Sequence, residues 1–232
     1  MSAIVGIIGV GGEGGTFLDW SLHFLVGDKH MSYTIVDRVN DTILHENVVF
    51  PILSNPLVEN GTAHYHRKTH PTDKTLPGCI EIAKNCADDS IKIHTMYIVG
   101  NLKSYENKGY QILSEEIIAE NPSINYIQYC FTPDIANELS YRIINKIPNI
   151  DTTIDKTNNM MNNLCMMQPV ANSKVYMLLA KDMFYNLDTE IHKIFDWLKL
   201  EIDAKVYDHW LSIYRLWQVK NNFTKKIAHD DK

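Results

Sequence analysis

The sequence predicts an α/β fold, a three-layer and mostly parallel sheet with a helical cap made by the C-terminal part of the chain. Two observations favour it. Short runs rich in β-branched residues alternate with helical patterns, which is typical of parallel strands joined by helices. The last part of the chain instead contains two consecutive amphipathic patterns, over 187–199 and 205–219. At 232 residues, the chain is expected to form one domain over 1–232.

The first βα unit has the clearest signals. Residues 3–9 form a short apolar run that glycines end abruptly, so a buried strand is expected there. Residues 16–25 place Phe17, Trp20 and other apolar side chains at helical spacing, and Gly27 supplies a C-terminal stop. The sequence between this strand and this helix is therefore a glycine-rich strand-to-helix turn.

Later elements follow the same alternation. Strands are expected over 33–37, 91–99, 124–131 and 175–180, and helices over 78–87, 111–120 and 133–146. Between 39 and 77 the patterns weaken and prolines recur, which predicts a long irregular segment of the kind that is often functional. Residues 149–167 are polar and rich in Asn and Met, and indicate a lid or a mobile loop.

Composition excludes several classes of function. A formal net charge of −6 argues against nucleic-acid partners and against binding to acidic membrane surfaces. No run approaches the roughly 18 apolar residues of a membrane span, so no membrane partner is expected. The four cysteines form no CxxC pair and are interpreted as free thiols in a reducing compartment, which favours a cytoplasmic location. They are Cys79, Cys86, Cys130 and Cys165.

The glycine-rich turn fits two designs for binding phosphate groups. Residues 9–14, GVGGEG, match the dinucleotide fingerprint GxGxxG between a strand and a helix. In that interpretation Asp37, at the end of the second predicted strand, binds a ribose hydroxyl of NAD. Asp37 lies later in the chain than the usual spacing of about 20 residues.

The second design is a P-loop-type turn. Gly9 and Gly14 have the Walker spacing, but Gly15 stands where the lysine belongs. Backbone N–H groups and the helix N-terminus would then hold the anion, with a hydroxyl from Thr16. The candidate binding residues are Gly11, Gly12, Gly14, Gly15 and Thr16. A tight turn that binds nothing is the third possibility.

Several segments resemble the sulfotransferase family. GEGGTFL at 12–18 is similar to that family's loop for the 5′ end of its sulfate donor, although Gly12 and Glu13 replace its lysine and serine. KTHP at 68–71 resembles a lysine–threonine–histidine segment, and VYMLLAKDMFYNLD at 175–188 resembles the late strand and acidic turn. YIVGNLKS at 97–104 resembles the strand and turn that carry the family's arginine for the 3′-phosphate, with Gly100 in the arginine position.

The resemblance implies a fold of P-loop type and a transferase activity. The donor would be phosphoadenosine phosphosulfate, bound over 11–16, and the acceptor a hydroxyl of a small molecule or glycan. His70 would accept the proton of that hydroxyl, and Lys68 would stabilise the bridging charge. No metal is required.

The segment TAHYHRKTHP at 62–71 also has other interpretations. His64, His66 and His70 could bind zinc, because His-x-His places two imidazoles on one face of an extended chain. It could equally be a polar surface loop. His94, inside a predicted strand, is interpreted as a core or edge histidine rather than a ligand.

Three functions therefore remain open: a sulfotransferase-like enzyme, an NAD-type oxidoreductase, and a non-catalytic relative that binds a ligand or partner. The order of strands discriminates between the first two. A second strand next to the first would favour NAD. A peripheral second strand, with Lys68 and His70 beside the glycine turn, would favour sulfate transfer.

Overall fold

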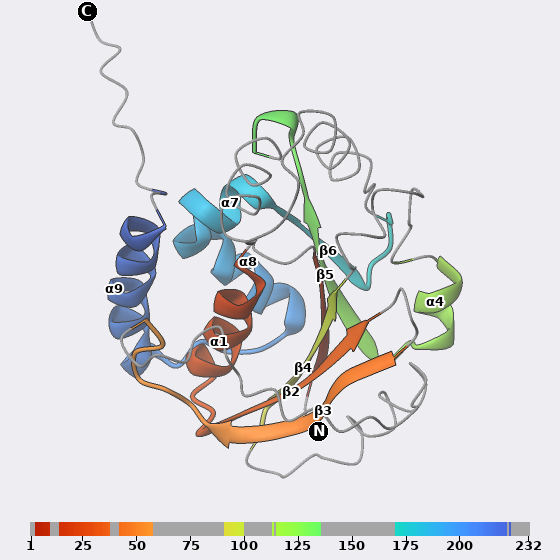
Figure 1. Ribbon diagram of the computed structural model, residues 1–232, viewed down its shortest axis with the longest axis horizontal. Coiled ribbons are helices and arrows are strands. Elements are labelled where there is room, and N and C mark those ends of the chain that lie inside the picture. Colours follow the sequence, from red (N-terminus) through yellow and green to blue (C-terminus); the bar gives the residue numbers. More distant parts are fainter. Residues whose placement is uncertain are drawn as a thin grey trace, which may run out of the picture.

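The computed structural model describes residues 3–9, 14–37, 42–57, 91–99, 113, 115–135, 170–221 and 223. The strands in these ranges are β1 (Ala3–Gly9), β2 (His30–Asp37), β3 (Thr42–Pro51), β4 (Ile93–Val99), β5 (Ile124–Cys130) and β6 (Val175–Leu179). The helices are α1 (Gly15–Leu25), α4 (Glu115–Glu120), α7 (Ala180–Tyr185), α8 (Leu187–Leu198) and α9 (Ala204–Lys220) (Figure 1). The predicted Gly78–Ala87 helix and the polar segment 149–167 lie outside the described residues.

The strands form one six-stranded sheet in the order β3-β2-β4-β1-β5-β6. Strands β2, β4, β1, β5 and β6 run parallel, and β3 pairs antiparallel with β2 at one edge. The predicted fold class, α/β with a mostly parallel sheet and a helical C-terminal cap, is therefore confirmed. The first strand, β1, lies inside the sheet, and the later strand β4 separates it from β2.

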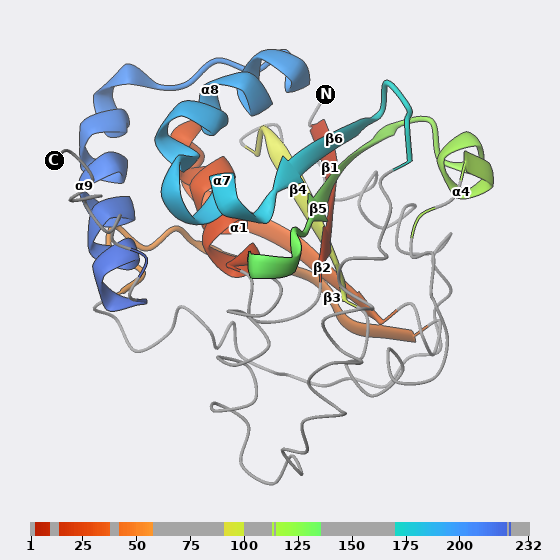
Figure 2. The ribbon, with the colours of Figure 1, turned by 90° about the horizontal axis from the view of Figure 1, so that it is seen from above.

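The described helices cover both faces of the sheet. α1, α7, α8 and α9 lie on one face, and α4 lies on the other, in both views (Figures 1 and 2). This arrangement gives the predicted three layers. Strand β1 is apolar along its length because both of its faces are covered: Ile4, Val5, Ile7 and Ile8 are all at most 7% exposed.

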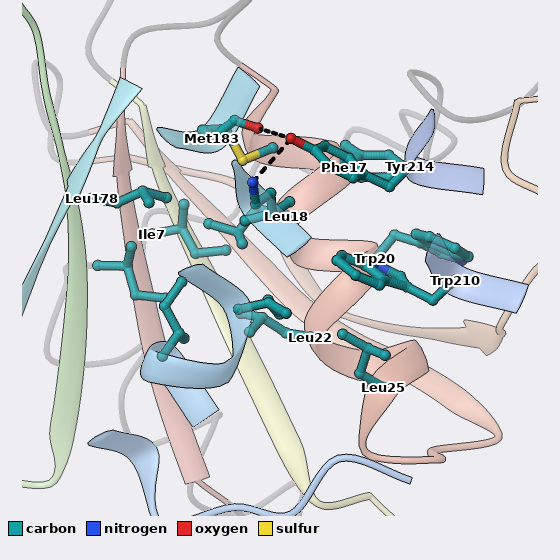
Figure 3. Close-up of a cluster of buried hydrophobic side chains, with 14 of the residues drawn as sticks. Ile7, Phe17, Leu18, Trp20, Leu22, Leu25, Leu178, Met183, Trp210 and Tyr214 are labelled. Carbon is teal, nitrogen blue, oxygen red and sulfur yellow. Dashed lines mark hydrogen bonds between the residues drawn. The ribbon is translucent and has the colours of Figure 1, made fainter. Parts of the chain in front are cut away.

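The main core lies between the sheet and the C-terminal helices. α1 contributes a buried apolar stripe, and the aromatic side chains of α9 pack against it (Figure 3). Phe17 stacks on Trp217 with ring centroids 4.8 Å apart. The Tyr214 hydroxyl accepts from the Leu187 N–H at 3.0 Å and donates to the Met183 carbonyl at 3.3 Å, which holds α7 and α8 on α9. Trp210 and Trp217 of α9 are both buried in this core.

Helix α9 runs antiparallel to α1 and contacts both of its ends. The Asp203 N–H, at the start of α9, donates to the Leu25 carbonyl at 2.7 Å. At the other end, a Cβ on Gly14 would lie 2.9 Å from the Trp217 ring. The C-terminal cap is thus part of the scaffold that positions α1.

Two sequence predictions were wrong. Thr42–Pro51, placed in an irregular segment, forms strand β3. Its antiparallel pairing with β2 contains two register shifts, and irregularities of this kind interrupt the alternation of side chains along a strand. Ala180, predicted to end the last strand, instead begins the short helix α7.

Hydrogen bonds from α1 and α9 hold residues 52–57, which follow β3. The Trp20 indole N–H donates to the Leu53 carbonyl at 2.9 Å, and His209 Nε2 donates to the Ser54 carbonyl at 2.8 Å. Lys220 Nζ donates to the Leu57 carbonyl at 3.0 Å. Residues 54–57 therefore run along α9 toward its C-terminal end.

A buried polar network joins α1 to β4. His23 Nδ1 lies 3.3 Å from Asp28 Oδ2, and His23 Nε2 lies 3.6 Å from Asp19 Oδ1. The Thr95 hydroxyl donates to Asp19, and the Lys92 N–H donates to Asp28 at 2.9 Å. Burial raises the pKa of Asp19, although the charge of His23 opposes this. All four side chains, Asp19, His23, Asp28 and Thr95, are buried, so this network belongs to the core that joins α1 to the sheet.

His94 is a buried core histidine, as the sequence predicts. It is 2% exposed, and its Nδ1 lies 2.6 Å from the Ser32 hydroxyl of β2. Burial, with a smaller contribution from the charge of His23, lowers its pKa from 6.5 to about 4.

We expect His94 to make the fold sensitive to mild acid. Between pH 6.5 and 4 the unfolded chain binds a proton at His94 that the folded chain excludes, so the free energy of unfolding falls as the pH falls. From pH 7.5 to pH 5 this group contributes a loss of about 2 kcal/mol. Urea denaturation at several pH values should show a shallower dependence in His94→Gln. Equal pH dependence in both proteins would contradict this account.

Candidate functional site

The candidate site lies at the carboxyl edge of the parallel strands. In open α/β sheets, ligands bind in the crevice outside these strand ends. Here β1 ends at Gly9, inside the sheet between β4 and β5, and α1 begins at Gly15. The start of α1 therefore points to the edge at which this fold class binds its ligands.

The first turn of α1 suits an anion. Gly14 is the N-cap residue, and its carbonyl accepts from the Phe17 and Leu18 N–H groups at 2.9 and 3.0 Å. Gly14 has no side chain that could accept from the first amides of α1, and the first turn contains no acidic residue. The partial positive charge of the helix end favours an anion there.

Gly14 also has a structural reason to be glycine. Its φ of 86° lies in the left-handed region. A Cβ at this position would lie 2.9 Å from Trp217 of α9 and 3.0 Å from Met183 of α7. The C-terminal cap therefore packs directly against the start of α1, and Gly14 is required by this packing whether or not the turn binds a ligand.

The structure brings together only part of the predicted site. Gly14, Gly15 and Thr16 lie at the start of α1. Gly11 and Gly12, proposed for the same loop, lie outside the described residues. So do Lys68 and His70, and the alternative metal ligands His64 and His66.

The strand order argues against the dinucleotide hypothesis. In the dinucleotide-binding order 3-2-1-4-5-6, the second strand pairs directly with the first. Here β4 separates β2 from β1, and Asp37 is level with Val99 of β4. Two strand spacings, roughly 10 Å, thus separate the ends of β2 and β1. The end of β2, at Asp37, is therefore not the direct neighbour of the end of β1, as the dinucleotide-binding order requires.

Charged residues after β5 and β6 also lie at the carboxyl edge. Asp134 follows β5 and is fully exposed. A hydrogen bond from the Thr132 hydroxyl is the main cause that lowers the pKa of Asp134, with smaller contributions from backbone N–H groups and from the charge of Lys181.

Other kinds of site receive no support from the described residues. Among them, no three His, Cys, Asp or Glu side chains are placed to hold a metal ion. Burial raises the pKa of the Cys130 thiol, which disfavours the reactive thiolate. No helix in the described ranges is long and apolar enough to cross a membrane.

Comparisons with known proteins assign no family. No family model matches the chain, and no curated protein matches it. Among solved structures, it is similar to a sugar kinase from Janibacter sp. HTCC2649, solved without ligand. The identity is 14%, the match covers 86% of this chain and 96% of that chain, and the TM-score is 0.43. A likeness at this level assigns no activity, and the α/β class follows from the strand order itself.

We expect Gly14→Ala to destabilise the protein by about 2 kcal/mol or more. The substitution combines a left-handed φ with a Cβ closer to Trp217 than side chains tolerate, so α7 or α9 must move. Urea denaturation followed by tryptophan fluorescence measures this change. A loss below about 0.5 kcal/mol, the level of an ordinary surface substitution, would show that the cap does not pack on the turn.

Proposed function

We propose that the chain is a sulfotransferase-like protein that binds phosphoadenosine phosphosulfate at the start of α1 and transfers sulfate to a hydroxyl of a small molecule or glycan. The supporting observation is the placement of the glycine turn. It connects β1, inside a parallel sheet, to a helix start without a side-chain cap, and the strand order is not that of dinucleotide-binding proteins.

Binding would depend mainly on backbone groups. The amides of Gly15 and Thr16 belong to the first turn of α1 and are suited to a phosphate oxygen. Gly11 and Gly12 would let the loop backbone approach the same group closely. The Thr16 hydroxyl would add a further donor.

Transfer would be a single in-line displacement. His70 accepts the proton of the acceptor hydroxyl while its oxygen attacks the donor's sulfur. The bond from sulfur to the bridging oxygen breaks, the 5′-phosphate leaves with that electron pair, and Lys68 stabilises the developing charge. The products are a sulfate ester and phosphoadenosine phosphate.

A ligand screen tests the proposed donor. Phosphoadenosine phosphate at about 100 times its Kd should stabilise the fold by about 2.7 kcal/mol, which raises Tm by roughly 5–10 °C. NAD and ATP at equal concentration should have little effect. Stabilisation by NAD alone would contradict the proposal, and no response to any of the three would favour a non-catalytic relative.

We expect His70→Ala to lower the rate of sulfate transfer by about 10²–10⁴-fold, because the acceptor hydroxyl loses its base. Lys68→Ala should lower it through loss of the stabilising cation. His64→Ala and Lys225→Ala serve as matched controls and should retain the rate. Transfer assays with labelled donor measure these effects. If both His70→Ala and Lys68→Ala transfer sulfate at the wild-type rate, these residues are not part of the mechanism.

A further inference from the structure

We propose that the free edge of β6 binds a second copy of this chain, so that the two β6 strands pair antiparallel and join the two sheets into one. The inference concerns a different part of the molecule from the glycine turn and does not depend on the proposed function. It rests on the exposed apolar side chains of β6, on the regular backbone of this strand and on the charges at its two ends.

Strand β6 carries exposed apolar side chains. Among the described residues, four large apolar side chains are exposed, and two of them, Met177 at 53% and Leu179 at 45%, lie on β6. Because they are two positions apart on a strand, they lie on the same face of the sheet. An edge strand also presents unpaired backbone groups, so exposed apolar side chains on it favour pairing with another strand.

The two edges of the sheet differ in regularity. Strand β3 forms one edge, and its pairing with β2 contains two register shifts. Irregularities of this kind protect an edge from pairing with other chains. Strand β6 forms the other edge, and it pairs with β5 without a shift from Val175 to Leu179. Of the two edges, β6 is therefore the one that suits a further strand.

The register of β6 on β5 shows which of its backbone groups face outward. The Tyr126 N–H of β5 donates to the Lys174 carbonyl at 2.7 Å. Alternate residues of a strand direct their N–H and C=O groups to opposite sides, so the even-numbered residues of β6 bond toward β5. Met177 and Leu179 therefore direct their backbone groups to the free edge. These are the same two residues whose side chains are exposed.

A two-fold axis at Leu178 brings these groups together. Antiparallel pairing about that residue puts Met177 of each copy level with Leu179 of the other. Residues that face each other in this way exchange hydrogen bonds, here from the Leu179 N–H of each copy to the Met177 carbonyl of the other. The exposed apolar side chains of the two copies then meet on the same face of the joined sheet.

The charges at the ends of β6 select this register. Lys174 directly precedes β6, and Asp182 lies in the first turn of α7, which directly follows it. Each is four positions from Leu178, so pairing about that residue brings Lys174 of one copy level with Asp182 of the other. The axis generates two such opposite-charge pairs. Pairing about Met177 instead would place Lys174 level with Ala180 and lose both.

The other exposed apolar pair lacks this complementarity. Leu216 and Val219 lie on α9 and are 53% and 58% exposed. An antiparallel pairing of two α9 helices that joins Leu216 to Val219 also places Arg215 level with Lys220, and these like charges repel. Self-association through α9 is therefore disfavoured, and Leu216 is a suitable control position.

Helix α8 holds β6 in a fixed position. The Tyr176 hydroxyl donates to the buried Glu190 carboxylate at 2.5 Å, and the Trp197 indole N–H donates to the Ser173 carbonyl at 3.1 Å. Lys193 Nζ lies 2.8 Å from the other Glu190 oxygen and balances its charge. Because β6 is held before it pairs, little ordering of this strand is needed on association.

Sedimentation velocity of the full chain across the micromolar range tests the pairing. Wild type should form dimers in this range, because an interface built on one short strand and two charge pairs is small. Met177→Lys puts a charge on the free edge and should raise the Kd of the dimer by about tenfold or more. Leu216→Lys makes the same kind of change at an equally exposed position of α9 and should leave the Kd unchanged.

Reversal of the end charges tests the register. Lys174→Glu and Asp182→Lys should each weaken the dimer by about tenfold, because like charges then face each other. The double variant should return the Kd to within about threefold of wild type, since opposite charges face each other again. Thermal unfolding of each variant checks that the fold is retained. A merely structural effect of the two substitutions would add in the double variant and would not cancel.

Several results would overturn the inference. A monomer at every concentration would do so, as would a dimer whose Kd Met177→Lys does not change, or additive weakening in the double variant. Hydrogen exchange gives an independent measurement, because the Leu179 amide should exchange more slowly as the protein concentration rises. Protection that is independent of concentration would show that part of the same chain covers β6, and would also contradict the inference.

Discussion

The contact between the start of α1 and the C-terminal cap is the constraint on which the site depends. Gly14 fits between Trp217 and Met183 only because it has no side chain, and Phe17 stacks on the same tryptophan one turn later. Residues more than 160 positions away in the sequence thereby fix where the first amides of α1 lie. An anion-binding helix end must be held in place before the ligand arrives, since disorder at this point would be lost on binding at an entropic cost.

The other end of α1 is fixed by polar groups instead. The Thr95 hydroxyl of β4 donates to Asp19, and His23 lies 3.3 Å from Asp28. Asp28 also accepts from the backbone N–H groups of Lys92 and Ile93, at the start of β4. A buried network of this kind contributes less to stability than an apolar core of equal volume, but its geometry admits few arrangements. Packing at one end and directed bonds at the other therefore set both the position and the rotation of α1.

The elements that were predicted correctly are those with a clear local pattern of apolar residues in the sequence. Strand β1 is a short apolar run, and helices α1 and α9 have amphipathic patterns, and these three elements were predicted close to their observed bounds. Strand β3 was missed because its stability comes from pairing with β2, which no local signal encodes. The insertion of β4 between β1 and β2 is also a long-range choice, and it argues against the dinucleotide interpretation.

The central claim is that backbone amides at the start of α1 bind an anionic nucleotide without a lysine in the loop. Amide NMR of isotopically labelled protein during titration with phosphoadenosine phosphate tests it most directly. The claim predicts that the Gly15 and Thr16 amide resonances shift downfield and saturate together with binding. Saturated binding that leaves these two resonances unchanged, with the shifts confined to other parts of the chain, would contradict it.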